Sequence, residues 1–111
     1  MLDEVNDLIR NLNKREVLPD SFLRMASVYY KFVSYINHTI ALFLSEEYDN
    51  VSLFIKRADK ELIYLKSNNE CSDLYFSLCE KYISKLSSYM LQNNLLGDFG
   101  MEMLPDKYKV I

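Results

Sequence analysis

Apolar residues recur at steps of three and four along most of the chain, which is the spacing of one face of an α-helix. The longest such stretch, residues 20–44, has no glycine or proline and reads DSFLRMASVYYKFVSYINHTIALFL. Its apolar positions are Phe22, Met25, Ala26, Tyr29, Phe32, Val33, Ile36, Ile40, Phe43 and Leu44. Because so broad an apolar face needs neighbours on more than one side, we predict that this stretch is the central helix of a small bundle.

The same periodicity predicts three further helices, over residues 2–15, 51–66 and 71–91. Polar or proline-containing segments separate them, at residues 16–20, 45–50, 67–70 and 92–94. Connections this short favour antiparallel neighbours. We therefore predict an all-α fold, an antiparallel bundle of about four helices with a long central helix, that forms a domain over residues 1–94.

The last stretch, residues 95–111, differs in kind. It holds both glycines of the chain and one of its two prolines, and no helical stripe runs through it. The segment Lys107-Tyr108-Lys109-Val110-Ile111 is typical of the start of a strand, with no partner strand before it. We predict an irregular tail here, either a linker to a small β domain that is absent or an arm that pairs with another molecule.

Composition limits the function classes. The chain has 111 residues, of which 50% are apolar and 14% aromatic, and this is enough to form the core of one domain. A net charge of -3 lacks the basic footprint of a dedicated nucleic-acid binder, so we expect no direct nucleic-acid binding. Polar residues such as Lys31 and His38 interrupt the apolar central stretch, which argues against a membrane span.

The two cysteines indicate a reducing compartment. On one helix, the Cα atoms of Cys71 and Cys79 would lie about 12 Å apart, too far for a disulfide. Their spacing also lacks the paired C-x-x-C geometry of a zinc site. We interpret both as small buried apolar residues of a cytoplasmic protein.

No set of catalytic or metal-binding residues stands out. His38 is the only histidine, and a lone histidine in an apolar helix is more often packed or half-exposed than reactive. The carboxylates of Glu46, Glu47 and Asp49 lack the order of a calcium loop and fit a solvated turn better. We expect no catalytic residue, cofactor or metal. A small nuclease of the HEPN type is disfavoured because Arg24 and His38 are too far apart.

The excess of tyrosine points instead to protein binding. The chain has 9 tyrosines, and Tyr64 lies off the inner stripe of its helix. Tyrosine is enriched at protein–protein interfaces because it combines a large apolar area with a polar tip. Lys56, Arg57 and Lys60 form a small basic patch, which is either an ordinary outer helix face or a docking patch for an acidic partner.

Two segments resemble one family. Residues 16–23, Glu-Val-Leu-Pro-Asp-Ser-Phe-Leu, resemble the entry to the second helix in archaeal subunits of the GINS replication complex, where a tyrosine-isoleucine pair follows, as Tyr35-Ile36 does here. Residues 73–75 and 81–83, Asp-Leu-Tyr and Lys-Tyr-Ile, are similar to the family's later helix, although the arginine of that motif is absent.

The resemblance implies a helical A domain followed by a linker and a small β-rich B domain. It implies a non-catalytic subunit of a homo- or hetero-oligomer, which joins the MCM helicase to a Cdc45/RecJ-like partner in DNA replication. By residue type and face, the candidates for the partner interface are Tyr29, Tyr30, Phe32, Tyr64 and Tyr82. The alternative function is a small helical regulator that binds a partner helix in a groove, as Bcl-2-like viral modules do.

Overall fold

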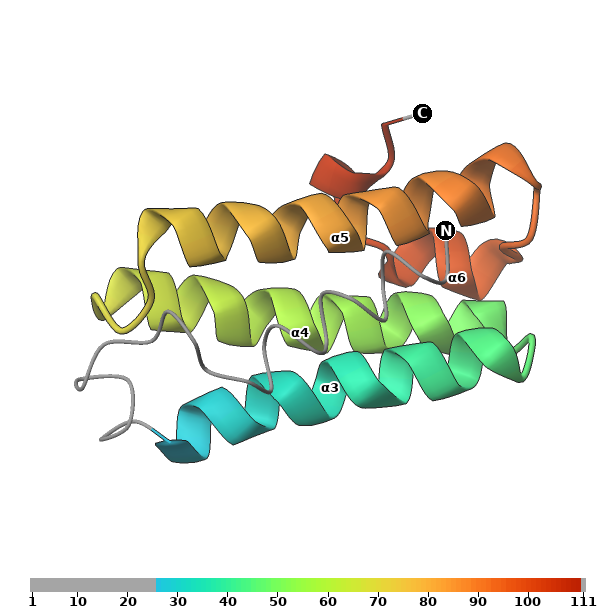
Figure 1. Cartoon of the computed structure of the whole chain (residues 1–111). Helices are drawn as coiled ribbons and strands as arrows, with labels where there is room; N and C mark the ends of the chain where they lie inside the picture. The colour runs from blue at the N-terminus through green and yellow to red at the C-terminus, as the bar shows by residue number, and fades with distance from the viewer. Residues whose placement is uncertain (1–25, 111) are drawn as a thin grey trace.

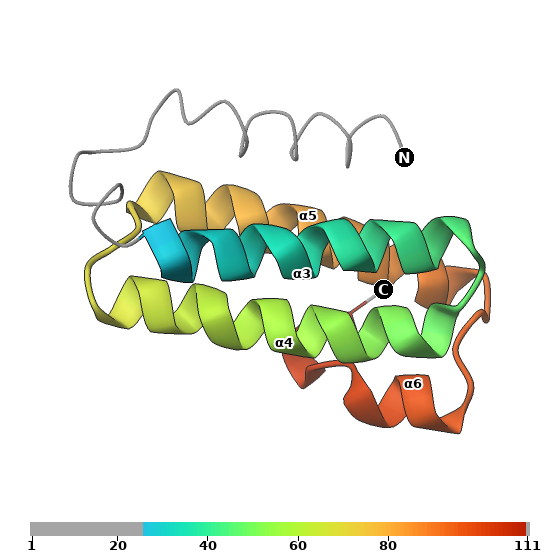
Figure 2. The same ribbon diagram turned by 90° about the horizontal axis from the view of Figure 1, so that it is seen from below.

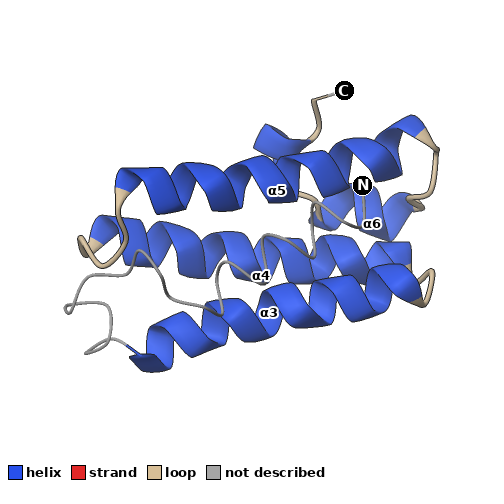
Figure 3. Cartoon of the chain, viewed as in Figure 1, coloured by secondary structure: helices blue, strands red, loops and turns tan. Residues whose placement is uncertain are grey.

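Four α-helices and one 3-10 turn make up the part of the chain that the structure, a computed structural model, describes: residues 26–110, without the side chains of residues 26–29, 33, 75 and 78. No strand occurs among these residues (Figures 1 and 3), so the all-α prediction is confirmed. The elements are α3 (Ala26–Leu44), α4 (Tyr48–Ser67), α5 (Asp73–Gln92), α6 (Asp98–Met103) and the 3-10 turn η1 (Asp106–Tyr108). The predicted helix 2–15 and the break at 16–20 lie outside the described residues.

Helices α4 and α5 begin close to the predicted positions. Helix α4 begins at Tyr48, three residues before the predicted start, because Tyr48, Asp49 and Asn50 form its first turn. The carboxylate of Asp49 in that turn suits the positive end of the helix dipole. Helix α5 begins at Asp73 rather than at residue 71 and has the same kind of acidic first turn.

Helices α3, α4 and α5 all end in the same way. Each is followed by a residue in the left-handed conformation, Glu46 (φ 60°), Asn69 (φ 56°) or Asn94 (φ 54°). The next N–H then bonds back to a carbonyl five residues earlier, which satisfies a helix-end acceptor. These bonds run from Glu47 to Leu42 (2.9 Å), from Glu70 to Leu65 (2.8 Å) and from Leu95 to Met90 (3.0 Å). Asparagine tolerates the left-handed conformation, which explains why two of the three breaks are asparagine pairs.

Helix α4 has the most neighbours among the described elements. Its backbone packs closely against those of α3, α5 and α6, whereas α3 meets α5 through side chains. Figure 2 shows α3 and α4 side by side, with α5 behind them and α6 beside α4. Among the described helices, α4 therefore occupies the central position that was predicted for residues 20–44. The buried apolar core contains Phe32, Ile36, Phe43, Val51, Ile55, Ala58, Leu62, Leu65, Cys71, Cys79, Ile83, Leu86, Met90, Leu104 and Tyr108.

The tail is irregular, as predicted, and its described part contains one short helix, one 3-10 turn and no strand. Helix α6 packs against the start of α4, where the Gly97 N–H donates a 2.7 Å hydrogen bond to Asp49 Oδ1. A Cβ atom on Gly100 would lie only 3.0 Å from the Asp49 Cα, so this glycine permits a close approach of two backbones. Further along, Leu104 and Tyr108 are 1% and 3% exposed, and η1 packs against α5. The strand predicted from Lys107 onward is wrong over the described residues 107–110.

Candidate interaction surface

The ring of Phe54 on α4 is the centre of an aromatic cluster on the α3–α4 pair. The imidazole of His38 stacks on it, with ring centroids 5.3 Å apart and planes 15° apart. The guanidinium carbon of Arg57 lies 4.8 Å from the ring centroid, and Tyr35 meets the ring edge-on at 6.2 Å. His38 Nδ1 is 2.9 Å from the Ser34 carbonyl oxygen, which can only accept, so this nitrogen carries the donated proton. These contacts fix the exposed imidazole in one orientation.

An ion pair lies on the same helix pair, one to two turns from this cluster. Lys31 Nζ is 3.0 Å from Glu61 Oε1, and this hydrogen bond and the charge of Glu61 raise the pKa of Lys31. Tyr30 and Tyr64 are neighbours of these residues along α3 and α4, one and three positions away, with 55% and 49% of their surface exposed. The structure thus brings two of the predicted interface tyrosines to the same end of the α3–α4 pair.

We refer to these residues together as the α3–α4 surface. It consists of Tyr30, Lys31, Tyr35, His38, Phe54, Arg57, Glu61 and Tyr64. His38 and Phe54 were not predicted as interface residues. The i,i+3 spacing of Phe54 and Arg57 was the available signal, because residues so spaced are neighbours on a helix.

The other predicted interface residues lie elsewhere. Phe32 is fully buried in the core, so its candidacy for a partner interface is corrected: it lies on the inner face of α3. Tyr82 is partly buried and packs against the core between α3, α4 and α5. The backbone of Tyr29 belongs to α3, but its side chain lies outside the described residues. An interface role for the remaining tyrosines stays a prediction.

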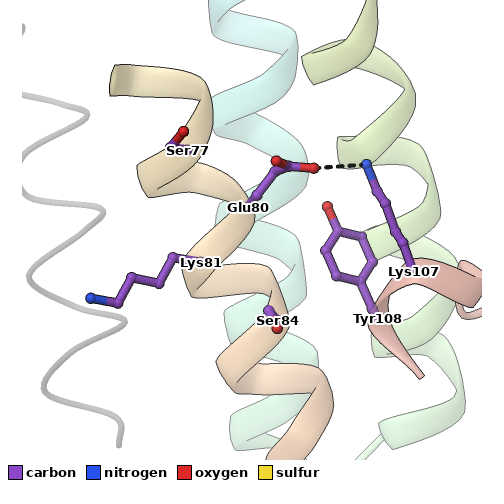
Figure 4. A pocket seen from close by; sticks show the side chains of 6 residues that line it. All are labelled: Ser77, Glu80, Lys81, Ser84, Lys107 and Tyr108. Carbon is purple, nitrogen blue, oxygen red and sulfur yellow. Dashed lines mark hydrogen bonds and ion pairs between the residues drawn. The ribbon is translucent and has the colours of Figure 1, made fainter. Parts of the chain in front are cut away.

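A second cluster, of charged and polar groups, connects the tail to α4 and α5, and Figure 4 shows its α5 side, where Glu80 faces Lys107. The Tyr108 hydroxyl donates a 2.8 Å hydrogen bond to Asp59 Oδ1, and Lys107 Nζ lies 2.7 Å from the same oxygen. Lys107 also reaches Glu80 Oε2 at 3.0 Å. Asp59 is only 6% exposed. Both of these partners belong to the tail, 48 and 49 residues later in the sequence. We call Asp59, Glu80, Lys107 and Tyr108 the tail clasp.

Lys107 and Tyr108 of the tail clasp hold their protons more tightly than free side chains do. Burial alone would lower the pKa of Lys107, but its hydrogen bonds to Asp59 and Glu80 outweigh this and raise it. Burial, and then the hydrogen bond to Asp59, raise the pKa of Tyr108. A general base needs a pKa close to the working pH, which neither group has. The adjoining hollow of about 320 Å³, also lined by Ser77, Lys81 and Ser84, lies open to solvent.

The carboxylates and cysteines that were considered as reactive or metal-binding groups have structural positions in the described residues. Asp49 accepts a hydrogen bond from the Gly97 N–H, and no three histidine, cysteine, aspartate or glutamate side chains in residues 26–110 gather to hold a metal ion. Cys71 and Cys79 are free and buried, and burial raises the pKa of Cys71 to about 11. Within the described residues, no helix has both the length and the apolar character needed to cross a membrane.

Comparison with known proteins adds no further assignment. No protein-family model matches the chain, and neither the search of curated proteins nor that of solved structures finds a match. The α3–α4 surface and the tail clasp are therefore the features from which a function is inferred.

Proposed function

We propose that this chain is a non-catalytic, protein-binding subunit that engages its partner through the α3–α4 surface. The observation that carries the proposal is the ordered stack of His38, Phe54 and Arg57, with half-exposed Tyr30 and Tyr64 on the same helix pair. Tyrosine and arginine are enriched among residues that dominate binding energy. Side chains already held in place also lose less conformational entropy on binding.

The specific form of this proposal is a GINS-like subunit that acts in the cytoplasm and links MCM to a Cdc45/RecJ-like partner. Its support is the resemblance over residues 73–75 and 81–83, which lie on α5. The other resembling segment, 16–23, lies outside the described residues. An unpaired strand in the tail no longer supports it, because residues 106–108 form η1.

The alternative, a regulator that holds a partner helix in a groove, finds less support in this part of the chain. It requires an apolar groove between helices that is wide enough for a helix of about 10 Å diameter. The apolar hollow where α3, α4 and α5 meet has a volume of about 10 Å³, roughly the room of one water molecule. Its lining residues are Ile36, Thr39, Ile40, Ile55, Tyr82, Ile83 and Leu86.

The test is affinity purification of the tagged full chain from its native host, followed by identification of the proteins that come with it. The informative variant is Tyr64→Lys, which places a charge in the α3–α4 surface. Phe99→Lys is the matched control, because Phe99 lies on α6 and is 45% exposed, close to the 49% of Tyr64. We expect a partner that is retained by the wild type and by Phe99→Lys but lost by Tyr64→Lys.

Two results would contradict the proposal. One is a wild-type chain that retains no protein and is a monomer by light scattering at every concentration tested. The other is a partner whose recovery falls equally with Tyr64→Lys and Phe99→Lys, since that would place binding elsewhere. A circular dichroism spectrum of each variant verifies that the helices are intact.

A further inference from the structure

One outward-facing stripe of α4 combines positive charge with a tyrosine. Leu53, Arg57, Lys60 and Tyr64 follow one another at steps of four, three and four, so they lie along one side of the helix over about 16 Å. Arg57, Lys60 and Tyr64 are exposed, and Leu53 is partly exposed. We call these four residues the α4 stripe.

Within the described part of the chain, no neighbouring acid forms an ion pair with the positive charges of the α4 stripe. Glu61 is paired with Lys31 and only 17% of its side chain is exposed, while Asp59 is buried against Lys107. Neither Arg57 nor Lys60 has an ion pair within residues 26–110. Among the described residues, the stripe therefore carries two positive charges that have no ion-pair partner, on a chain whose net charge is -3.

Arg57 is also held in place before any partner arrives. Its guanidinium carbon lies over the Phe54 ring, 4.8 Å from the ring centroid, and His38 and Tyr35 also contact that ring. A guanidinium stacked on an aromatic ring keeps its N–H groups available in the plane of the group. A carboxylate is the ligand that matches this planar set of donors, because it accepts two parallel hydrogen bonds.

We propose that the α4 stripe binds an acidic segment of a partner protein, with Arg57 and Lys60 pairing with carboxylates and Tyr64 packing against an adjacent apolar side chain. This inference rests on the proposed protein-binding function and names the chemistry of the partner. A nucleic acid is a poorer match for the stripe. Duplex DNA carries a negative charge about every 1.7 Å, and its binders present a basic surface much larger than two cations.

The probes are two labelled synthetic peptides and one labelled single-stranded DNA of matching length. The peptides share their apolar positions, and they carry glutamate or lysine at every polar position. Fluorescence anisotropy with the full chain measures each Kd at about 50 mM and about 200 mM salt. We expect the acidic peptide to bind at least about tenfold more tightly than the basic peptide and the DNA, with a Kd that rises with salt.

The double variant Arg57→Glu/Lys60→Glu should raise the Kd of the acidic peptide at least about tenfold. Two single variants distinguish an effect of the α4 stripe from an effect of net charge. Lys60→Glu and Lys81→Glu change the net charge equally, but Lys81 lies on α5, outside the stripe, and is also exposed. Lys60→Glu should weaken binding several-fold more than Lys81→Glu. The single variants keep the test valid if the double variant loses its helical spectrum.

Three results would overturn the inference: no binding of the acidic peptide, equal effects of Lys60→Glu and Lys81→Glu, or DNA binding as tight as that of the acidic peptide. The proposed function fails separately. If a host protein is retained by the wild type and by Arg57→Glu/Lys60→Glu but lost with Tyr64→Lys, the α3–α4 surface stands and the acidic partner is wrong. If the wild type retains no protein and is a monomer by light scattering at every concentration tested, the function itself is wrong.

Discussion

The phenolic oxygen of Tyr108 donates a 2.8 Å hydrogen bond to the carboxylate of Asp59, 49 residues earlier in the chain. The acceptor oxygen is buried, and Lys107 approaches it from the same 3-10 turn. A buried carboxylate without partners is strongly unfavourable, so the tail and α4 depend on each other.

Replacement of this phenol should destabilise the chain. Tyr108→Phe keeps the ring in the core but removes a hydrogen bond to a buried charged acceptor, which is worth about 1.5–3 kcal/mol. Urea denaturation followed by circular dichroism measures the loss. Tyr64→Phe is the control, because Tyr64 is half-exposed and its variant should stay within about 0.5 kcal/mol of the wild type. Equal stability of the two variants would show that the Tyr108 bond contributes nothing.

The tail clasp also predicts a loss of stability at alkaline pH. The pKa values of Tyr108 and Lys107 are raised in the folded chain above their ordinary values of 10.0 and 10.5. The folded state therefore binds these protons more tightly than the unfolded state. Their contribution is complete below about pH 10 and is lost as the pH rises towards the folded pKa values, by at most about 1.4 kcal/mol per pH unit for each group.

The Tyr108→Phe variant isolates one part of this dependence. Its stability should fall less steeply than that of the wild type between about pH 10 and pH 11. The buried cysteines also resist deprotonation, and both are present in each of the two chains. Parallel slopes for the two chains would contradict the assignment to Tyr108. The measurement is denaturant unfolding at a series of pH values.

The left-handed residue after α3 offers a stabilising substitution. Glu46 has φ 60°, a conformation that costs most L-residues about 1–2 kcal/mol. Glu46→Gly should therefore stabilise the chain by about 0.5–1 kcal/mol, since glycine relieves this strain but gains entropy in the unfolded state. Asn94→Gly is the comparison, because asparagine already tolerates φ 54° and should gain less. Thermal unfolding measures the stability of both variants. A Glu46→Gly variant that is less stable than the wild type would contradict the prediction.

Two buried serines differ in their hydrogen bonding and should respond differently to alanine. The Ser52 hydroxyl has no hydrogen-bond partner among the described residues, whereas Ser87 donates to the Ile83 carbonyl at 2.7 Å. Ser52→Ala should be neutral or stabilising by up to about 1 kcal/mol, and Ser87→Ala should cost about 0.5–1.5 kcal/mol. Both residues are fully buried, so the pair is matched in exposure. The reverse order of stabilities in urea would refute the assignment.

The bundle could be predicted from the sequence because its pattern is local. Each long helix carries its apolar residues on one face, and polar pairs such as Asn68-Asn69 and Asn93-Asn94 mark where two of them end. The Nδ2 atoms of Asn68 and Asn93 donate to the carbonyls of Tyr64 and Tyr89, both at 2.8 Å. Signals that act over four residues are visible in a sequence.

The tail and much of the site could not be predicted because they depend on contacts between distant residues. Both glycines contributed to the prediction of a linker or arm, and nothing in the sequence indicated that Gly97 and Gly100 lie very close to Asp49. The burial of Tyr108 depends on Asp59, far away in sequence. By contrast, the exposure of Tyr64 could be predicted, because this residue lies off the inner apolar stripe of its helix. Phe32 belonged to the inner stripe of its own helix and was better predicted as core.

The tail clasp has a consequence for the order in which a ribosome delivers the parts of this protein. Asp59 and Glu80 are synthesised well before Lys107 and Tyr108, the two residues that satisfy them. While translation proceeds, the nascent α4–α5 hairpin holds a carboxylate whose native partners are still inside the exit tunnel. The final tightening of the bundle therefore waits until residue 108 has emerged, and a nascent chain stalled before that point should be markedly easier for a protease to cut.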